Sequence, residues 1–352
     1  MQGDRCGHGG GRFARQCVIR CKAINSGFRR ALSVCMLAAF VPGVAGFDAS
    51  AQSFPVRPLK ILVGYSPGGP ADALARIAAQ ILAEGLGKPV VVENRPGAGG
   101  TIATSAAAKA TPDGYTLVAT ATSDVINPLF NKQVHYNIET DFAPIALVAS
   151  APNVLVVHPS IPVRSTQELV EYGRAHPGTL NYGSAGVGTV SHLAGALVAE
   201  RARVKFVHVP YKGTAAAQTD LLSGRLQFMF DSIISALGNA KAGKVKALAV
   251  TSPERWHSAP ELPTMAESGF PGFNMTAWFG LMAPAGTPAP IVSRIAEVLS
   301  KGLQSVEVRD RIAAIGAEAG RMSPAEFGRY IHAENTRWKK LFADDLIRIE
   351  ER

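Results

Sequence analysis

The sequence predicts an α/β protein with two domains built from alternating strands and helices. Apolar residues first form a short run without helical spacing, Ile61–Val63, and then recur at three- and four-residue intervals from Leu74 to Ile81. Such a change of period indicates a buried strand followed by a helix. The same alternation continues along most of the chain, whose 352 residues suit two domains of ordinary size. Alternating strands and helices favour mostly parallel sheets.

The first domain is predicted to contain two further strands, at Pro89–Glu93 and Tyr115–Thr120, with an alanine-rich helix between them. A helix over Val125–Phe130 follows the third strand. Because parallel strands end at the same edge of a sheet, the loops at Ser66–Asp72 and Ala121–Asp124 are expected to meet there.

The second domain begins near Ala151-Pro152, and an apolar strand at Thr276–Ala283 is expected to return the chain to the first sheet. Capping-box patterns at Ser165–Glu168 and Ser323–Glu326 predict two helix starts. The strands predicted in the second domain are Val154–Val157, Leu180–Tyr182, Phe206–Val209, Leu226–Phe230 and Val245–Val250. The predicted boundaries are residues 1–51 for a leader, 52–152 for the first part of lobe 1, 153–275 for lobe 2 and 276–352 for the second part of lobe 1.

The first 51 residues have the features of a secretory signal peptide. Arg29-Arg30 precedes an apolar stretch of about 11 residues, and Ala49-Ser-Ala51 supplies a small-x-small cleavage site. A membrane-spanning helix needs roughly 20 apolar residues, so an anchor is the weaker interpretation. All four cysteines precede residue 36, and the mature chain would carry no thiol. We therefore expect export to the periplasm with cleavage near Ala51; the paired arginines leave the twin-arginine route open.

The positive charge of the chain is concentrated in this leader. The formal net charge is +9, but residues 1–51 hold seven basic and two acidic side chains, which leaves 29 basic and 25 acidic side chains in the rest. A nearly balanced mature chain does not predict a nucleic-acid groove, which requires a concentrated basic surface. No nucleic-acid partner is expected.

Two glycine-rich loops, each between a strand and a helix, form the candidate binding site. Gly68-Gly69 follows the first strand, and the loop at 182–192 contains glycines spaced as G-x-x-G-x-G rather than as the dinucleotide motif G-x-G-x-x-G. Backbone amides at a helix N-terminus, together with the hydroxyls of Ser184, Thr189 and Ser191, predict an anion-binding nest.

Catalytic and metal-binding patterns are weak. Ser191 and His192 are adjacent, but neighbours on a helix point about 100° apart and do not make a nucleophile–base pair. The sequence has no G-x-S-x-G elbow, and its eight histidines show no metal-ligand spacing. Asp72, Asp124 and Asp231 follow separate strands and are more simply explained as helix caps. No cofactor or metal is expected; a hydrolase using His192 or Asp124 in the same cleft remains the enzymatic alternative.

Six motifs of the mature chain together resemble one known family. They are YSPGGPAD at 65–72, VVENRPGAGG at 91–100, PDGYTL at 112–117, NYGSAGVG at 181–188, VPYKG at 209–213 and Phe230-Asp231. In these motifs the chain is similar to the Bug proteins, the extracytoplasmic solute-binding components of tripartite tricarboxylate transporters. The similarity extends from Phe54 to the helix that carries Trp338.

The resemblance implies a two-lobed periplasmic-binding-protein fold (type II, Venus flytrap) with a hinged cleft. It implies a non-catalytic protein that captures a small carboxylate for membrane permease subunits, with both glycine loops holding the carboxylate through amides, hydroxyls and ordered waters. A monomer is expected. The implied ligand-binding residues are Ser66, Pro67, Gly68, Gly69, Asp72, Ser123, Gly183, Ser184, Gly186, Thr189, Lys212, Gly213 and Asp231.

One departure from the family pattern falls in the first loop. The family usually has Thr or Ser before the aspartate, where this chain has Ala71, so the hydroxyl of this position in the binding loop is missing. A second function class also stays open, because a ligand-sensing partner of a membrane receptor would use the same closing cleft.

Overall fold

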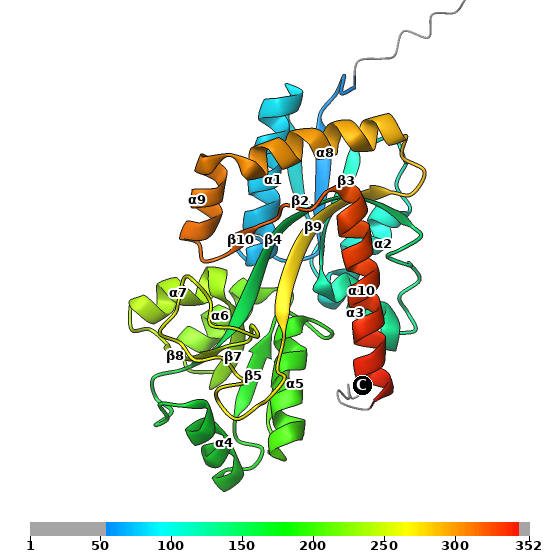
Figure 1. The fold of residues 1–352 in the computed structure, drawn as a ribbon. Helices are drawn as coiled ribbons and strands as arrows, with labels where there is room; N and C mark the ends of the chain where they lie inside the picture. Colours follow the sequence, from blue (N-terminus) through cyan, green and yellow to red (C-terminus); the bar gives the residue numbers. More distant parts are fainter. Residues whose placement is uncertain (1–53, 345–352) are drawn as a thin grey trace, which may run out of the picture. The chain divides into compact units, whose positions relative to one another are not determined.

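The computed structural model describes residues 54–344, in which strands and helices alternate (Figure 1). The predicted signal peptide, the four cysteines and the tail from residue 345 lie outside the described residues. The strands are β1 (Leu59–Val63), β2 (Val90–Asn94), β3 (Thr116–Ala121), β4 (Phe142–Val157), β5 (Asn181–Ser184), β6 (Val207–Pro210), β7 (Phe228–Ser232), β8 (Lys246–Val250), β9 (Thr276–Pro284) and β10 (Glu318–Ala319). The helices are α1 (Pro70–Leu86), η1 (Ala98–Gly100), α2 (Thr101–Ala108), α3 (Thr122–Phe130), α4 (Thr166–Ala175), α5 (Val190–Ala202), α6 (Thr214–Leu222), α7 (Ile233–Lys241), α8 (Ala289–Gln304), α9 (Val306–Ala314) and α10 (Pro324–Ala343).

The opening strand β1 lies between β2 and β3 and is parallel to both. Its side chains alternate between two helical layers, as the two-residue period of a strand requires. Ile61 and Val63 pack in the cluster that contains α1, whereas Leu62 packs with Ala103 and Ala107 of α2. Burial on both faces explains why the β1 sequence is an uninterrupted apolar run.

Strand β4 is shared by the two halves of the sheet. Its residues from Phe142 to Pro152 pair with β9, and its residues from Asn153 to Val157 pair with β7, all antiparallel. The sequence predicted only Val154–Val157 as a strand. The longer strand was missed because proline is normally excluded from strand interiors, and here the pairing with β9 shifts register next to Pro144.

The second half of the sheet repeats the parallel arrangement of the first. Strand β5 is parallel to β6 on one side and to β7 on the other. Phe228 and Phe230 of β7 pack in the cluster that contains α5, while Met229 packs in the cluster that contains α6. The predicted lobe boundaries, 52–152, 153–275 and 276–352, remain a proposal.

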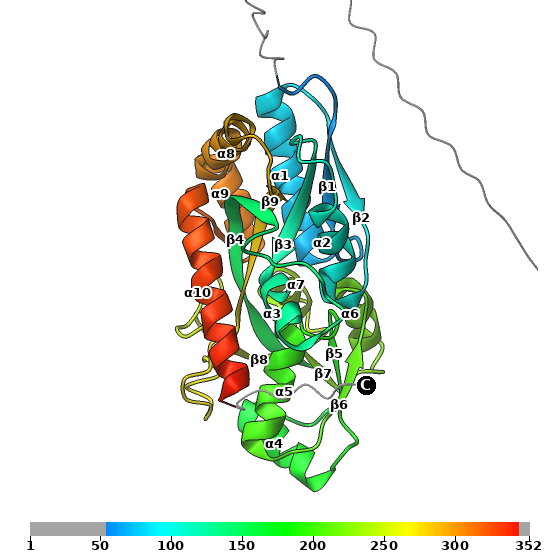
Figure 2. The same ribbon diagram turned by 90° about the vertical axis from the view of Figure 1, so that its right-hand side faces the viewer.

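The C-terminal part packs back on the first half of the chain. Helix α8 packs on α1, and α10 packs against β4 and α3 (Figures 1 and 2). Trp338 of α10 is fully buried, and its indole nitrogen donates to Glu334 at 3.1 Å. None of the helices in residues 54–344 combines the length and the apolar character that a membrane span requires.

The predicted helix starts are largely confirmed. Ser323 and Glu326 form a reciprocal capping box at the start of α10. At α4 the Ser165 hydroxyl accepts from the amide of Glu168, but the Glu168 carboxylate accepts from the amide of Arg164 instead of returning to Ser165.

Helix α3 begins at Thr122, three residues before the predicted Val125. Asp124 lies in its first turn, where the carboxylate accepts from the backbone amide of Ala121 at 2.8 Å. The aspartate therefore caps the helix from inside its first turn rather than from the N-cap position.

Candidate ligand-binding site

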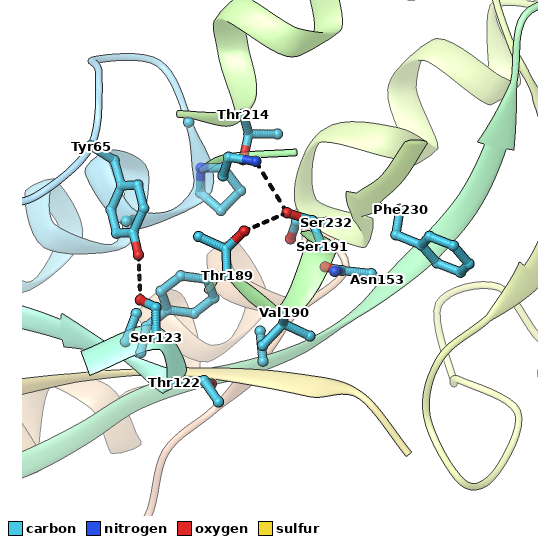
Figure 3. A pocket seen from close by; sticks show the side chains of 17 residues that line it. Tyr65, Thr122, Ser123, Asn153, Thr189, Val190, Ser191, Thr214, Phe230 and Ser232 are labelled. Atoms are coloured by element: carbon cyan, nitrogen blue, oxygen red, sulfur yellow. Dashed lines mark hydrogen bonds between the residues drawn. The ribbon is translucent and has the colours of Figure 1, made fainter. Parts of the chain in front are cut away.

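A pocket lies where strands of both halves of the sheet end (Figure 3). The predicted meeting of the first two loops is confirmed, because Gly69 and Ser123 both line the pocket.

Five helices begin at this pocket. Each contributes residues from its first turn or its N-cap: α1 through Gly69–Ala71, α3 through Ala121–Ser123, α5 through Thr189–Ser191, α6 through Thr214 and α7 through Ser232. The first-turn amides of a helix have no partner inside the helix, and the helix dipole places a partial positive charge there. The five starts therefore bring backbone amides to the pocket without a basic side chain.

The side chains of the lining carry no fixed charge. Among the pocket-lining residues there is no Asp, Glu, Lys, Arg or His. The described part of the chain also has no group of three or more His, Cys, Asp or Glu side chains placed to hold a metal ion. The pocket can therefore hold a small anion through amides and hydroxyls.

Tyr65, which follows β1, links the first loop to the start of α3. Its hydroxyl donates to the carbonyl oxygen of Gly99 at 2.9 Å and shares a short hydrogen bond with the Ser123 hydroxyl. Burial of the phenol is the largest cause of the raised pKa of Tyr65, and the nearby Asp124 carboxylate raises this pKa further. The phenol therefore stays neutral and fixes the orientation of Ser123 at the pocket wall.

In the second loop the hydroxyls bind the loop itself. Thr189 Oγ1 donates to the Gly186 carbonyl at 2.6 Å, and Ser191 Oγ accepts from the Ala185 amide at 3.1 Å. Thr189 Oγ1 and Ser191 Oγ also lie 3.0 Å apart as a hydrogen-bonded pair. With both hydroxyl protons used internally, the free amides of the first turn of α5 are the donors left for a ligand.

Asp72 organises the first loop and does not line the pocket. It accepts from the Gly68 amide at 3.0 Å, from Arg76 at 3.0 Å and from Asn94 at 2.9 Å. Burial raises the pKa of Asp72, but the hydrogen bonds from Arg76, Gly68 and Asn94 outweigh this effect and hold it below its usual range.

Asp231 and Asp124 are buried carboxylates behind the pocket wall. Asp231 accepts from Gln218 Nε2 and from Ser235 Oγ, each at 2.6 Å, and burial raises its pKa to about 7. Asp124 accepts from Thr104 Oγ1 at 2.6 Å, and burial raises its pKa as well. Each aspartate therefore holds together the elements around it, and neither presents its carboxylate to the pocket.

His192 is held as a neutral packing residue. Its Nδ1 accepts from the Gly188 amide at 3.2 Å, its ring stacks on His208 with centroids 3.9 Å apart, and burial lowers its pKa to about 4. Ser191 Oγ is bonded to Thr189 and the Ala185 amide, and no hydrogen bond joins it to His192.

Of the residues predicted to bind the ligand, Gly69, Ser123 and Thr189 line the pocket. The remaining predicted residues lie outside this lining, in the loops and in α1, β5 and β7: Ser66, Pro67, Gly68, Asp72, Gly183, Ser184, Gly186, Lys212, Gly213 and Asp231. Their role in binding stays a prediction.

Three of these predicted residues bring the loops together. The Lys212 carbonyl accepts from both the amide and the hydroxyl of Ser66. Gly213 has a φ of +148°, and a Cβ there would lie 3.0 Å from the Ser66 amide nitrogen. A glycine is therefore needed for this close approach.

Sequence reasoning missed several polar residues of the lining. Tyr65 is the first residue of the motif at 65–72, and Thr214 and Ser232 directly follow a motif, so taking each whole motif and the position after it would have included them. Asn153 had no such signal, because it lies inside a strand that the sequence did not predict in full.

The sheet has two halves, and the pocket lies where helices from both halves begin. This arrangement defines a solute-binding protein of the two-lobed periplasmic type. Similar solved structures bear this out. "R. palustris Rpa4515 with adipate" is 36% identical with a TM-score of 0.80, and the match covers 84% of this chain and 99% of that one. "MatC (Rpa3494) from Rhodopseudomonas palustris with bound malate" is 34% identical with a TM-score of 0.79, covering 82% and 99%.

A family model described as "Tripartite tricarboxylate transporter family receptor" matches residues 74–345. "Protein BugT" of Bordetella pertussis is 34% identical over 311 residues, which cover 88% of this chain and 95% of BugT. The chain belongs to this receptor family, that of the Bug proteins, and the predicted two-lobed α/β fold is confirmed.

Proposed function

We propose that this protein captures a small carboxylate in the periplasm and delivers it to the membrane permease subunits of a tripartite tricarboxylate transporter. The observation that carries the proposal is the convergence of five helix N-termini on one pocket. Such termini bind anions through backbone amides and the helix dipole. The names of two similar structures mention adipate and malate, both carboxylates, which supports the same ligand class.

The absence of a basic side chain from the lining suits a protein that must release what it binds. A carboxylate paired with a buried guanidinium leaves an unpaired charge behind when it departs, and that cost slows release. Amides and hydroxyls carry no net charge, so the empty pocket can be solvated at lower cost.

Opening and closing would occur between the two glycine loops. Ser66 contacts the carbonyl of Lys212 directly, so a ligand between α1 and α5 would add contacts to a closed arrangement of the lobes. A ligand that contacts both lobes shifts the equilibrium toward closure by its differential affinity. We propose that permease subunits recognise this closed state, and that the protein acts as a monomer.

We also propose that the protein does not transform its ligand. The neutral His192 accepts a hydrogen bond from its own loop, and the Asp124 carboxylate is bonded to Thr104 behind the pocket wall. Neither group is placed to take a proton from a ligand in the pocket. Incubation of the purified protein with its ligand should return the ligand unchanged by mass spectrometry.

Binding is tested with a pair of matched glycine variants. Gly69 lies at the pocket with φ −88°, so a larger residue fits the backbone but fills the binding space. A Cβ added to Gly238 in α7 would meet no neighbouring atom within 4 Å, so this position serves as the control. We expect Gly69→Leu to abolish the thermal stabilisation that carboxylates confer, while Gly238→Leu retains it.

Native mass spectrometry of the protein purified without refolding identifies the retained ligand. Retention of a carboxylate, lost in Gly69→Leu, supports the proposal. Full carboxylate-dependent stabilisation of Gly69→Leu would place the binding site elsewhere and refute it.

A further inference from the structure

Ser232, at the N-cap of α7, has a hydroxyl that finds no hydrogen-bond partner among residues 54–344. The residue is 6% exposed. Within residues 54–344 only three buried side-chain polar atoms lack a partner, and the other two belong to Thr166 and Trp278. Of the three residues, only Ser232 lines the pocket. A buried hydroxyl left unpaired costs stability, and a ligand oxygen at this position would remove that cost.

Asn153 lies directly beside Ser232. The two residues are cross-strand partners in the antiparallel pairing of β4 with β7. Asn153 is 4% exposed and lines the pocket, and its backbone amide donates to Thr251 Oγ1 at 2.8 Å. Its side-chain amide makes no hydrogen bond with another residue in the described part of the chain, and so it is available to the pocket.

This pair is separate from the loop that orients Ser123. In Figure 3, Tyr65 and Ser123 lie on one side of the pocket, and Asn153 lies on the opposite side. A ligand that spans the pocket would therefore meet two distinct polar regions.

We propose that Ser232 and Asn153 form a second subsite, which binds an uncharged oxygen of the ligand and thereby selects a hydroxy- or oxo-carboxylic acid. The inference rests on the proposed carboxylate binding and adds the identity of the ligand group at the end opposite the bound carboxylate. A ligand hydroxyl can accept from the Ser232 hydroxyl and donate to the side-chain oxygen of Asn153, because each of these side chains has at least one donor and one acceptor.

The surrounding charges disfavour a second carboxylate at this subsite. Asp231, the residue before Ser232, already places its carboxylate at the start of α7, where Ser235 donates to it at 2.6 Å. A second anion beside it would find no Lys, Arg or His among the pocket-lining residues. Because the Asp231 carboxylate already accepts from groups at this helix start, less of the partial positive charge of the α7 N-terminus is left for a second carboxylate.

An ammonium group is disfavoured for the opposite reason. None of the pocket-lining residues is an aspartate or glutamate, so the ammonium of an amino acid would be buried without an anionic partner. The carboxylates of Asp72, Asp124 and Asp231 do not line the pocket, and each accepts a hydrogen bond from a residue of a nearby helix: Arg76, Thr104 and Gln218, respectively.

The test uses acids that differ only at the far end. Isothermal titration calorimetry measures the affinity for straight-chain acids of three to six carbons. Each chain length is tested in four matched forms, which end in a methyl, hydroxymethyl, carboxylate or aminomethyl group. We expect the hydroxy acid of one chain length to bind about tenfold more tightly than its methyl counterpart, as one additional hydrogen bond predicts. The diacid and the amino acid should bind more weakly than the hydroxy acid.

Two variants and a control assign the effect to the subsite. Ser232→Ala should weaken the hydroxy acid about tenfold and leave the methyl acid within about twofold, and Asn153→Ala should act in the same direction. Thr166→Val removes another unpaired buried hydroxyl outside the pocket and should change neither affinity. Because Ser232→Ala removes an unpaired polar atom, the melting temperature of the unliganded protein should not fall.

The outcomes separate the two proposals. Binding of no carboxylate by the native protein overturns the proposed function and the subsite together. Two results overturn the subsite and leave the proposed function standing. In the first, methyl and hydroxy acids bind with equal affinity. In the second, both subsite variants lower the affinity for every acid by the same factor. Tightest binding of the diacid or the amino acid overturns the assignment of an uncharged oxygen.

Discussion

The carbonyl oxygen of Lys212 accepts two hydrogen bonds from Ser66, one from the backbone amide and one from the hydroxyl, each at 3.0 Å. Ser66 follows β1, and Lys212 lies 146 residues later, after β6. The contact therefore joins the two halves of the protein at their glycine loops. We propose that closure of the pocket depends on this joint as well as on the ligand.

Ser66→Ala tests the hydroxyl part of this joint. The variant keeps the amide bond to Lys212 but loses one exposed hydrogen bond, worth about 0.5–1.5 kcal/mol. We expect ligand affinity to fall by roughly two- to tenfold in calorimetry, with little change in the melting temperature of the unliganded protein. Ser223→Ala removes a comparable bond within one turn, from Ser223 Oγ to the Asp220 carbonyl, and should leave affinity unchanged. Equal effects of the two variants would contradict a role in closure.

Tyr65→Phe tests the polar wall of the first loop. The substitution leaves the Gly99 carbonyl and the Ser123 hydroxyl without their shared partner, and we expect the free energy of unfolding to fall by about 1–3 kcal/mol. Urea denaturation measures the loss. The control is Tyr172→Phe, because Tyr172 contributes a stacked ring against His176 and its hydroxyl donates to no described residue. An unchanged midpoint for Tyr65→Phe would show that the hydroxyl is dispensable.

Asp231→Asn tests the buried carboxyl behind the proposed subsite. Burial raises the pKa of Asp231 in the folded protein to about 7, above the ordinary aspartate value of 3.8. The folded state therefore binds the proton more tightly than the unfolded state, and the stability from this group is lost as pH rises from about 4 through about 7. A pKa difference of this size corresponds to about 4 kcal/mol at most.

We expect the variant to be less sensitive to pH than the native protein when unfolding is compared at pH 5 and pH 8. Gln218 donates to Oδ2 of Asp231 and Ser235 donates to Oδ1, and asparagine keeps one of these two acceptor oxygens. Parallel pH profiles of the two proteins would rule out a raised pKa at this position.

Ala71→Ser tests the departure from the family pattern. Ala71 is in the first turn of α1, is 8% exposed and lines the pocket. A hydroxyl there would add one donor beside the α1 amides, so we expect carboxylate affinity to rise by about two- to tenfold in calorimetry. Ala75→Ser places the same group one turn later, outside the pocket lining, and should not tighten binding. A loss of affinity in Ala71→Ser would indicate that the position excludes polar atoms.

Local patterns in the sequence were sufficient to predict most elements. The apolar run of β1, the helical spacing of α1 and the Ser323–Glu326 capping box each depend on residues within one or two turns of one another, so the physics that sets them is visible in a short window. The two glycine loops were predicted for the same reason, because a strand, a tight turn and a helix start are all local features.

The tertiary structure alone decided which polar groups share the pocket. Asn153 and Ser232 meet because β4 and β7 pair in one antiparallel register, and the sequence does not state which of several strands β4 will pair with or in what register. Five helix starts converge for the same reason: the order of strands in the sheet places their ends together. The sequence by itself determined the local elements and the family, whereas long-range strand pairing determined the composition of the site.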